Sequence, residues 1–154
     1  MAGPLKSGSP GKSGKITGKI AVVVSRWNED ITGALLQGAT DTLKAAGIRK
    51  SNLLIREVPG SFELPLAAQQ FAEKRNTAGV ICIGCLIKGD TPHFDYISGA
   101  VAQGIMDVNL KTGKPVIFGV LTTNTRQQSI DRAGGKLGNK GEEAALTLLE
   151  LLRH

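Results

Sequence analysis

The fold is decided by the stretch Val80-Ile-Cys-Ile-Gly-Cys-Leu-Ile-Lys-Gly-Asp-Thr-Pro-His-Phe-Asp-Tyr96. Its first half, 80–87, is almost continuously apolar and has strand length, which is typical of a central parallel strand buried on both faces. A polar turn follows, with helix-start signals in Gly89, Asp90, Thr91 and Pro92. A helix is then predicted, because apolar residues recur at three-and-four spacing, at Phe94, Ile97, Val101, Ile105 and Val108.

The turn between this strand and this helix has the features of an anion site. Free backbone N–H groups of Asp90 and Thr91 are expected at the helix N-terminus, where the helix dipole favours an anion such as phosphate. His93 lies in the same first turn and is the only histidine besides the C-terminal one. Taken alone, it is equally well explained as an exposed or capping residue. Its place after a parallel strand favours a ligand site, because open α/β sheets bind ligands there.

Length and composition predict one domain. A chain of 154 residues buries enough surface for an ordinary core. Residues 1–15 are mostly Gly, Pro, Ser and Lys, so we interpret them as a flexible tail before a domain at 16–154. Most of the net charge of +6 comes from lysines before residue 20, and aromatic residues make up 4%, so nucleic-acid binding is disfavoured. We expect a cytoplasmic protein, because no apolar stretch is long enough for a membrane span or a signal peptide.

The two cysteines do not have the pattern of a disulfide or a metal site. Cys82 and Cys85 alternate inside the apolar strand, so they are expected to project from opposite faces of the sheet. No second pair completes a zinc site, and no metal is predicted. We interpret both as small core residues, with Cys85 close enough to the strand end to line the ligand site.

The sequence pattern predicts four strands that alternate with helices along the chain. This order is typical of a three-layer α/β sandwich with a four-stranded parallel sheet. Besides the central strand, strands are predicted at Ile20–Ser25, Leu53–Val58 (at an edge or otherwise less buried) and Pro115–Leu121. Helices are predicted at Ile31–Ala46, from Ser61 or Phe62 through Phe71, at Thr122–Ala133 and at Asn139–Leu152. The turns after the strands should converge on one edge of the sheet. No dinucleotide fingerprint or P-loop follows any strand, so nucleotide-dependent chemistry is disfavoured.

Two C-terminal features bear on assembly and on anion binding. The last predicted helix is apolar around much of its circumference, through Leu146, Leu148, Leu149, Leu151 and Leu152. A surface helix of a monomer does not need all of these, so part of that surface is expected to meet another subunit. Glycines and lysines in the segment 134–141 suit either an anion-binding loop or a helix-to-helix linker, and the linker is favoured.

Five ordered motifs over residues 20–152 make the chain resemble the lumazine synthase family. The motifs are Arg26-Trp-Asn28, Pro59-Gly-Ser-Phe-Glu63, the segment 84–96, Pro115-Val-Ile-Phe-Gly119, and Asp131-Arg-Ala-Gly-Gly-Lys-Leu-Gly-Asn-Lys-Gly141. The resemblance implies a flavodoxin-like fold in pentamers whose active sites lie between neighbours. It also implies condensation of 5-amino-6-ribitylaminouracil with 3,4-dihydroxy-2-butanone 4-phosphate to 6,7-dimethyl-8-ribityllumazine and phosphate. No cofactor or metal is implied, and riboflavin synthase is an implied further partner.

The same resemblance assigns roles to individual residues. His93 is the expected proton donor and acceptor. Asp90 and Thr91 are expected to hold the phosphate, with Arg132 of a neighbouring subunit completing the clamp. Asn28 and Lys140 are weaker candidates. The pyrimidine substrate is expected to meet Trp27, Ser61, Phe62, Glu63, Cys85, Leu86 and Ile87, and also Phe118 of the neighbour.

The chain departs from the family pattern at Lys88 and at Asn124-Thr125, where altered packing rather than lost activity is expected. Two other readings remain open. A non-catalytic flavin or lumazine carrier would retain Trp27 but dispense with His93 and Arg132, both present here. A self-assembling shell is compatible with catalysis, and the compact linker at 134–138 favours a 60-subunit icosahedral particle over a lone pentamer or a pair of pentamers.

Overall fold

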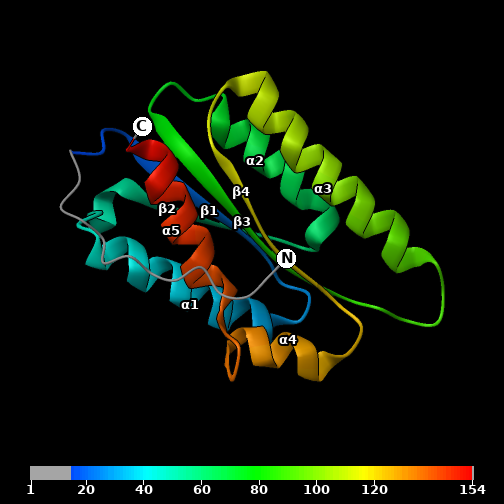
Figure 1. Ribbon diagram of the computed structural model, residues 1–154. Coiled ribbons are helices and arrows are strands. Elements are labelled where there is room, and N and C mark those ends of the chain that lie inside the picture. The colour runs from blue at the N-terminus through cyan, green and yellow to red at the C-terminus, as the bar shows by residue number, and fades with distance from the viewer. Residues whose placement is uncertain (1–14, 154) are drawn as a thin grey trace.

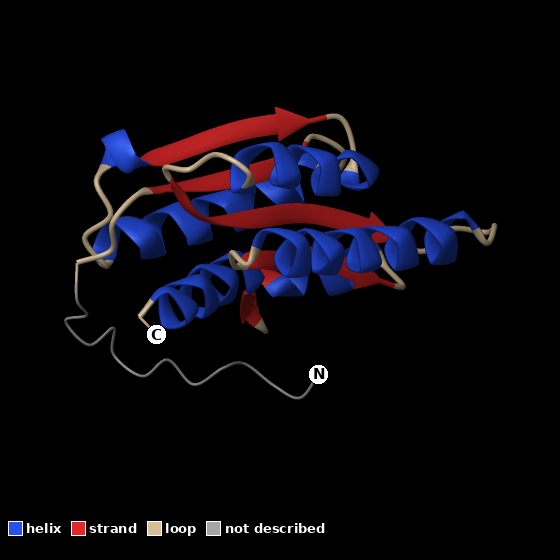
Figure 2. Cartoon of the chain, turned by 90° about the horizontal axis from the view of Figure 1, so that it is seen from above, coloured by secondary structure: helices blue, strands red, loops and turns tan. Residues whose placement is uncertain are grey.

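A computed structural model describes residues 15–153 as one four-stranded parallel sheet covered by helices on both faces (Figure 1). The strand order is β2-β1-β3-β4, and all four strands point the same way (Figure 2). The predicted flavodoxin-like sandwich is therefore confirmed. The strands are β1 (Lys19–Ser25), β2 (Leu53–Val58), β3 (Thr77–Ile87) and β4 (Val116–Thr123). The helices are α1 (Glu29–Ala45), α2 (Leu64–Ala72), α3 (His93–Thr112), α4 (Arg126–Arg132) and α5 (Lys140–Leu152).

The central strand predicted from sequence is β3, and it has β1 on one side and β4 on the other. Alternate residues of β3 enter two separate cores. Ile81, Ile83 and Cys85 pack with α1 and α5, whereas Val80 and Cys82 pack with α2 and α3. The two cysteines thus lie on opposite faces, as predicted, and both thiols are free. Double burial explains the continuous apolar run, because neither face of β3 meets water.

The edge position of β2 also agrees with the sequence. Its middle residues Ile55, Arg56 and Glu57 are exposed, which fits its mixture of apolar and charged side chains. Helix α1 ends near Gly47, whose φ of +93° suits glycine at a helix end. Asn139 caps α5, since its side-chain oxygen accepts from the N–H groups of Gly141 and Glu142.

Several helix and strand ends differ from the prediction, and two 3₁₀ turns were not predicted. A 3₁₀ turn, η2 (Ser61–Glu63), precedes α2, and another, η1 (Lys50–Asn52), precedes β2. Pro92 is the residue before α3 rather than its first helical residue, and neither Asp90 nor Thr91 is the N-cap. These shifts amount to one turn or less, the range over which helix ends fray.

The predicted polar helix at 122–133 is wrong over part of its length. Thr122 and Thr123 continue β4, because they pair with Leu86 and Ile87 of β3. Helix α4 begins only after Thr125, whose hydroxyl accepts from the Gln128 N–H. After α4 the chain forms a hairpin of β5 (Ala133–Gly135) and β6 (Gly138–Asn139), which fits the interpretation of this segment as a linker.

Helix α5 is less uniformly buried than its leucines suggest. Leu148 and Leu149 enter the core of the chain, whereas Leu151 is 53% exposed and lies near the outer edge strand β4. Almost all of the predicted tail at 1–15 lies outside the described residues. Among residues 15–153, no helix is long and apolar enough to cross a membrane. The same residues contain no cluster of His, Cys, Asp or Glu suited to a metal ion.

Candidate active site

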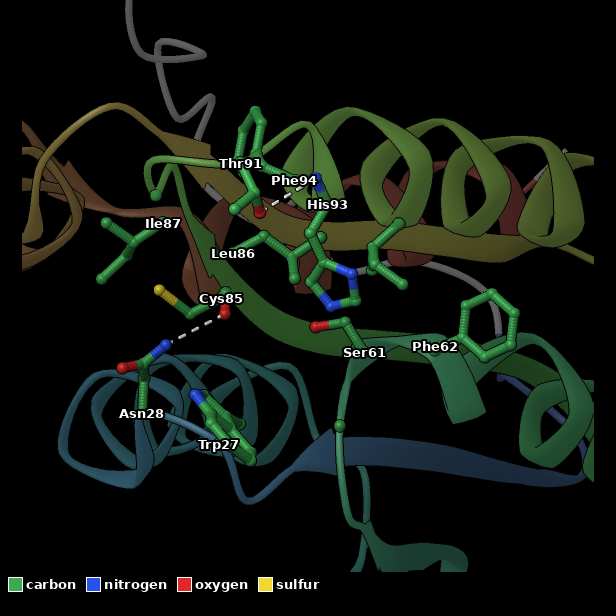
Figure 3. Close-up of a pocket in the computed structure, with 13 residues that line it drawn as sticks. Trp27, Asn28, Ser61, Phe62, Cys85, Leu86, Ile87, Thr91, His93 and Phe94 are labelled. Atoms are coloured by element: carbon green, nitrogen blue, oxygen red, sulfur yellow. Dashed lines mark hydrogen bonds between the residues drawn. The ribbon is translucent and has the colours of Figure 1, made fainter.

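A cavity of about 390 Å³ opens at the carboxyl ends of β1, β2 and β3 (Figure 3). Three segments from different parts of the chain form it: the turn after β1, the turn after β2, and the end of β3 with the loop and helix that follow. This is the edge at which the sequence predicted that the turns converge. Its lining residues are Trp27, Asn28, Gly60, Ser61, Phe62, Cys85, Leu86, Ile87, Gly89, Thr91, His93, Phe94 and Ile97.

The turn after β1 places an indole at the cavity. The backbone N–H groups of Arg26 and Trp27 donate to Val58 and Pro59 (2.9 and 3.2 Å), which ties the turn to the end of β2. Asn28 adopts a left-handed conformation (φ 60°), one that asparagine tolerates better than most residues. Its side-chain nitrogen donates to the Cys85 carbonyl at 3.2 Å, which ties the turn to β3 as well. Trp27 is 74% exposed, so it is not a core residue and its ring is free to cover a ligand.

The turn after β2 contributes one polar and one aromatic side chain. Ser61 is buried, and its hydroxyl has no hydrogen-bond partner within the described residues. Phe62 is 58% exposed at the cavity wall. Glu63 is different, because its Oε2 accepts from the Gly60 N–H at 2.9 Å and the residue does not line the cavity. In this chain Glu63 therefore fixes the turn.

The end of β3 offers backbone groups to the cavity. Strand β1 pairs with β3 only as far as Ile83, so no strand covers the β1 side of Cys85, Leu86 and Ile87. The Asn28 side chain already donates to the Cys85 carbonyl. Beyond Cys85, alternate backbone N–H and C=O groups on this side of β3 have no partner strand in the described part of the chain and remain open to a ligand. The Cys85 thiol points away, donating to the Ser129 hydroxyl at 3.3 Å. Burial raises the pKa of this thiol, which makes it a poor nucleophile.

The loop after β3 brings the predicted anion site and the histidine to the same cavity. The N–H groups of Asp90 and Thr91 donate no hydrogen bond to any described residue. The Asp90 side chain is exposed and does not line the cavity, whereas Thr91 does. His93 begins α3, and its N–H donates weakly to Thr91 Oγ1 at 3.4 Å. Figure 3 shows the imidazole of His93 and the hydroxyl of Ser61 directed toward the same part of the cavity.

Besides Glu63 and Asp90, which lie next to this cavity without lining it, three predicted site residues lie elsewhere. Phe118, Arg132 and Lys140 line a second hollow of about 660 Å³ along β4, between α3 and α5. Phe118 is 42% exposed there. Arg132 Nη1 donates to the Gln128 carbonyl at 2.9 Å, and Lys140 pairs with Glu143 at 2.7 Å. A single chain therefore holds the candidate residues in two separate groups.

The structure adds residues that the sequence did not single out. Arg126, at the start of α4, forms an ion pair with Asp30 at the start of α1, and a 3.5 Å bond to Asn28 Oδ1. Asp30 and Arg126 are too far apart in the chain for any local pattern to reveal the pair. Phe94 and Ile97 had been interpreted only as one face of a helix, but they also line the cavity.

Comparison with known proteins gives one consistent family. A family model described as 6,7-dimethyl-8-ribityllumazine synthase matches residues 17–154. A relative of that name from Bacteroides fragilis is 53% identical over 134 residues, covering 87% of this chain and 94% of its own. Another from Cytophaga hutchinsonii is 53% identical over 143 residues, covering 93% of this chain and 88% of its own. A third, from Parabacteroides distasonis, is 50% identical and covers 86% of this chain and 83% of its own. The chain therefore belongs to the 6,7-dimethyl-8-ribityllumazine synthase family.

Proposed function

We propose that the cavity at the carboxyl edge of the sheet is the place where this chain makes 6,7-dimethyl-8-ribityllumazine. The reaction condenses 5-amino-6-ribitylaminouracil with 3,4-dihydroxy-2-butanone 4-phosphate and releases phosphate and water. One observation carries the proposal: an exposed indole, an imidazole and the unoccupied backbone N–H of Thr91 share a single cavity, and the unoccupied N–H of Asp90 adjoins it. These are the groups needed to hold a flat ring, bind an anion and move a proton.

The pyrimidine substrate occupies the side of the cavity formed by β1 and the end of β3. The Trp27 ring stacks on the heterocycle, and the open backbone groups at 85–87 bind its polar edge. The ribityl chain extends toward Ser61 and Phe62. The Ser61 hydroxyl has no hydrogen-bond partner within the described residues, so it is available to a ribityl hydroxyl. Glu63 shapes this end by accepting from the Gly60 N–H through Oε2, and its other carboxylate oxygen is left for a ribityl hydroxyl.

The phosphate substrate binds at the loop before α3. The free N–H groups of Asp90 and Thr91, with the N-terminus of a helix of 20 residues behind them, attract the dianion. The Asp90 carboxylate faces solvent, so it does not oppose the phosphate at short range. Arg132 of a neighbouring subunit supplies the paired donors that suit phosphate, with Lys140 as a secondary cation.

His93 carries out the proton transfers. The 5-amine attacks the ketone and water leaves to give an imine; phosphate is then eliminated, and the enol that results tautomerises to a ketone. The ribitylamine nitrogen attacks this ketone, which closes the second ring, and a second water leaves. Each of these steps moves a proton at nitrogen or oxygen, and a positioned imidazole serves as acid and base near neutral pH. The cavity also holds the two reactive substrates in alignment, which raises the rate in addition to this proton transfer.

The division of candidate residues between two hollows supports an active site shared by neighbours. We propose a pentamer in which the β4 side of one chain, with Phe118 and Arg132, closes the His93 cavity of the next. A head-to-tail contact of this kind forms a closed ring. Twelve such rings would form the 60-subunit shell that the compact linker favours. Light scattering on the purified protein is expected to give a mass of five or sixty chains, and a monomer with full activity would contradict this proposal.

The reaction itself is tested by mixing the two substrates with the purified chain. We expect lumazine absorbance to rise together with release of inorganic phosphate, in a one-to-one ratio. A non-catalytic lumazine carrier is the second candidate, since its ring-binding groups are the same. The carrier would bind the product yet release no phosphate, so the phosphate assay separates the two. Two buried free cysteines fit a cytoplasmic setting for either function.

A further inference from the structure

Arg126 links three segments that surround the ring-binding side of the cavity. Its guanidinium pairs with the carboxylate of Asp30 and also reaches Asn28 Oδ1 at 3.5 Å. Asn28 in turn donates from Nδ2 to the Cys85 carbonyl at 3.2 Å. Helix α4, the turn before α1 and the end of β3 are thus joined by one chain of polar contacts. The ion pair also lowers the pKa of Asp30, which keeps that carboxyl charged.

These contacts hold Asn28 in its left-handed conformation. With Oδ1 facing Arg126 and Nδ2 facing Cys85, the orientation of the amide is fixed at both ends. Its neighbour Trp27 is 74% exposed, so packing against other side chains restrains the indole only weakly. The position of the Trp27 ring therefore depends on the conformation of the turn that Asn28 holds.

We propose that Arg126 is a positioning residue that sets the Trp27 turn and the Cys85 carbonyl for the pyrimidine substrate. The inference rests on the proposed function for the identity of that substrate. Arg126 does not line the cavity, so it acts through Asn28 rather than by touching the ligand. Both partners of the ion pair are at least half exposed, and such pairs contribute little to global stability. The Arg126–Asp30 pair is therefore expected to order this turn rather than to stabilise the whole fold.

The test is Arg126→Ala with steady-state kinetics for both substrates. We expect KM for the ribitylaminouracil to rise about tenfold, because small misplacements of positioning groups are costly, with kcat and KM for the phosphate substrate within about twofold. The melting temperature should be nearly unchanged, and Arg126→Lys should recover part of the lost affinity. Lys111→Ala is the matched control, since it removes a comparable exposed ion pair with Glu73 that lies outside the cavity.

A second readout needs no substrate. Trp27 is the only tryptophan of the chain, so fluorescence excited at the red edge, where Tyr96 does not absorb, reports on this turn alone. Arg126→Ala is expected to lower the fluorescence anisotropy of Trp27, and Lys111→Ala to leave it unchanged. Unchanged anisotropy and unchanged KM in Arg126→Ala would overturn the inference. If the wild-type chain made no lumazine but Arg126→Ala still loosened Trp27, the proposed function would fail while the positioning role stood.

Discussion

Replacing His93 with alanine is expected to lower kcat by about 10²-fold, since one positioned acid–base group typically contributes at least that much. The reaction should not stop, because both substrates are intrinsically reactive and the cavity still aligns them. KM for either substrate should change little. The imidazole is exposed at the cavity and none of its ring atoms forms a hydrogen bond to a described residue, so its removal disturbs few contacts.

The measurement is stopped-flow or steady-state absorbance of the lumazine product at saturating concentrations of both substrates. His93→Gln provides the matched control, because glutamine retains polar groups near the same place without acting as an acid or base at neutral pH. Both variants should be slow if proton transfer is what His93 provides. Wild-type turnover by His93→Ala would remove this residue from the mechanism and leave alignment as the main source of catalysis.

Local sequence patterns predicted the part of the site that lies in one continuous segment. The run 80–96 contains a buried strand, a turn and a helix start, and hydrophobic periodicity identified all three. The edge strand at 53–58 was predicted with the bounds that the structure has. These elements are decided by burial and by backbone preferences that act over a few residues, so their signals are visible in the chain itself.

Contacts between segments far apart in the sequence could not be predicted from local sequence patterns. Thr122 and Thr123 were assigned to a helix, yet β3 extends to Ile87 and pairs with them, so strand pairing overrode a polar local pattern. The contact of Arg126 with Asp30 joins two helix starts on the same side of the sheet and has no local sequence signature. The family resemblance pointed to the candidate site residues, whereas the structure shows which groups they contact within the chain.

The position of Arg132 raises a different question, because it lies with Phe118 on the β4 side and not at the His93 cavity. Its Nη1 donates to Gln128, which uses one of five guanidinium N–H donors and leaves the others for a ligand. Arg132→Ala is expected to raise KM for the butanone phosphate at least tenfold, a loss typical of a charge-assisted phosphate contact. KM for the pyrimidine substrate should stay near the wild-type value. Lys136→Ala, which removes an exposed cation that lines neither cavity, is the control.

Mixing the two defective chains tests whether neighbours share the site. In a head-to-tail ring of His93→Ala and Arg132→Ala chains at equal amounts, about one site in four joins an intact His93 to an intact Arg132. Co-expressed chains should therefore recover about a quarter of wild-type activity at low phosphate substrate, although each parent alone retains at most about a tenth there. The double variant His93→Ala/Arg132→Ala, co-expressed with His93→Ala, contains no intact pair and should stay inactive. If co-assembly were verified by mass spectrometry and activity did not return, Arg132 would act on the His93 of its own chain, and the shared site would be wrong.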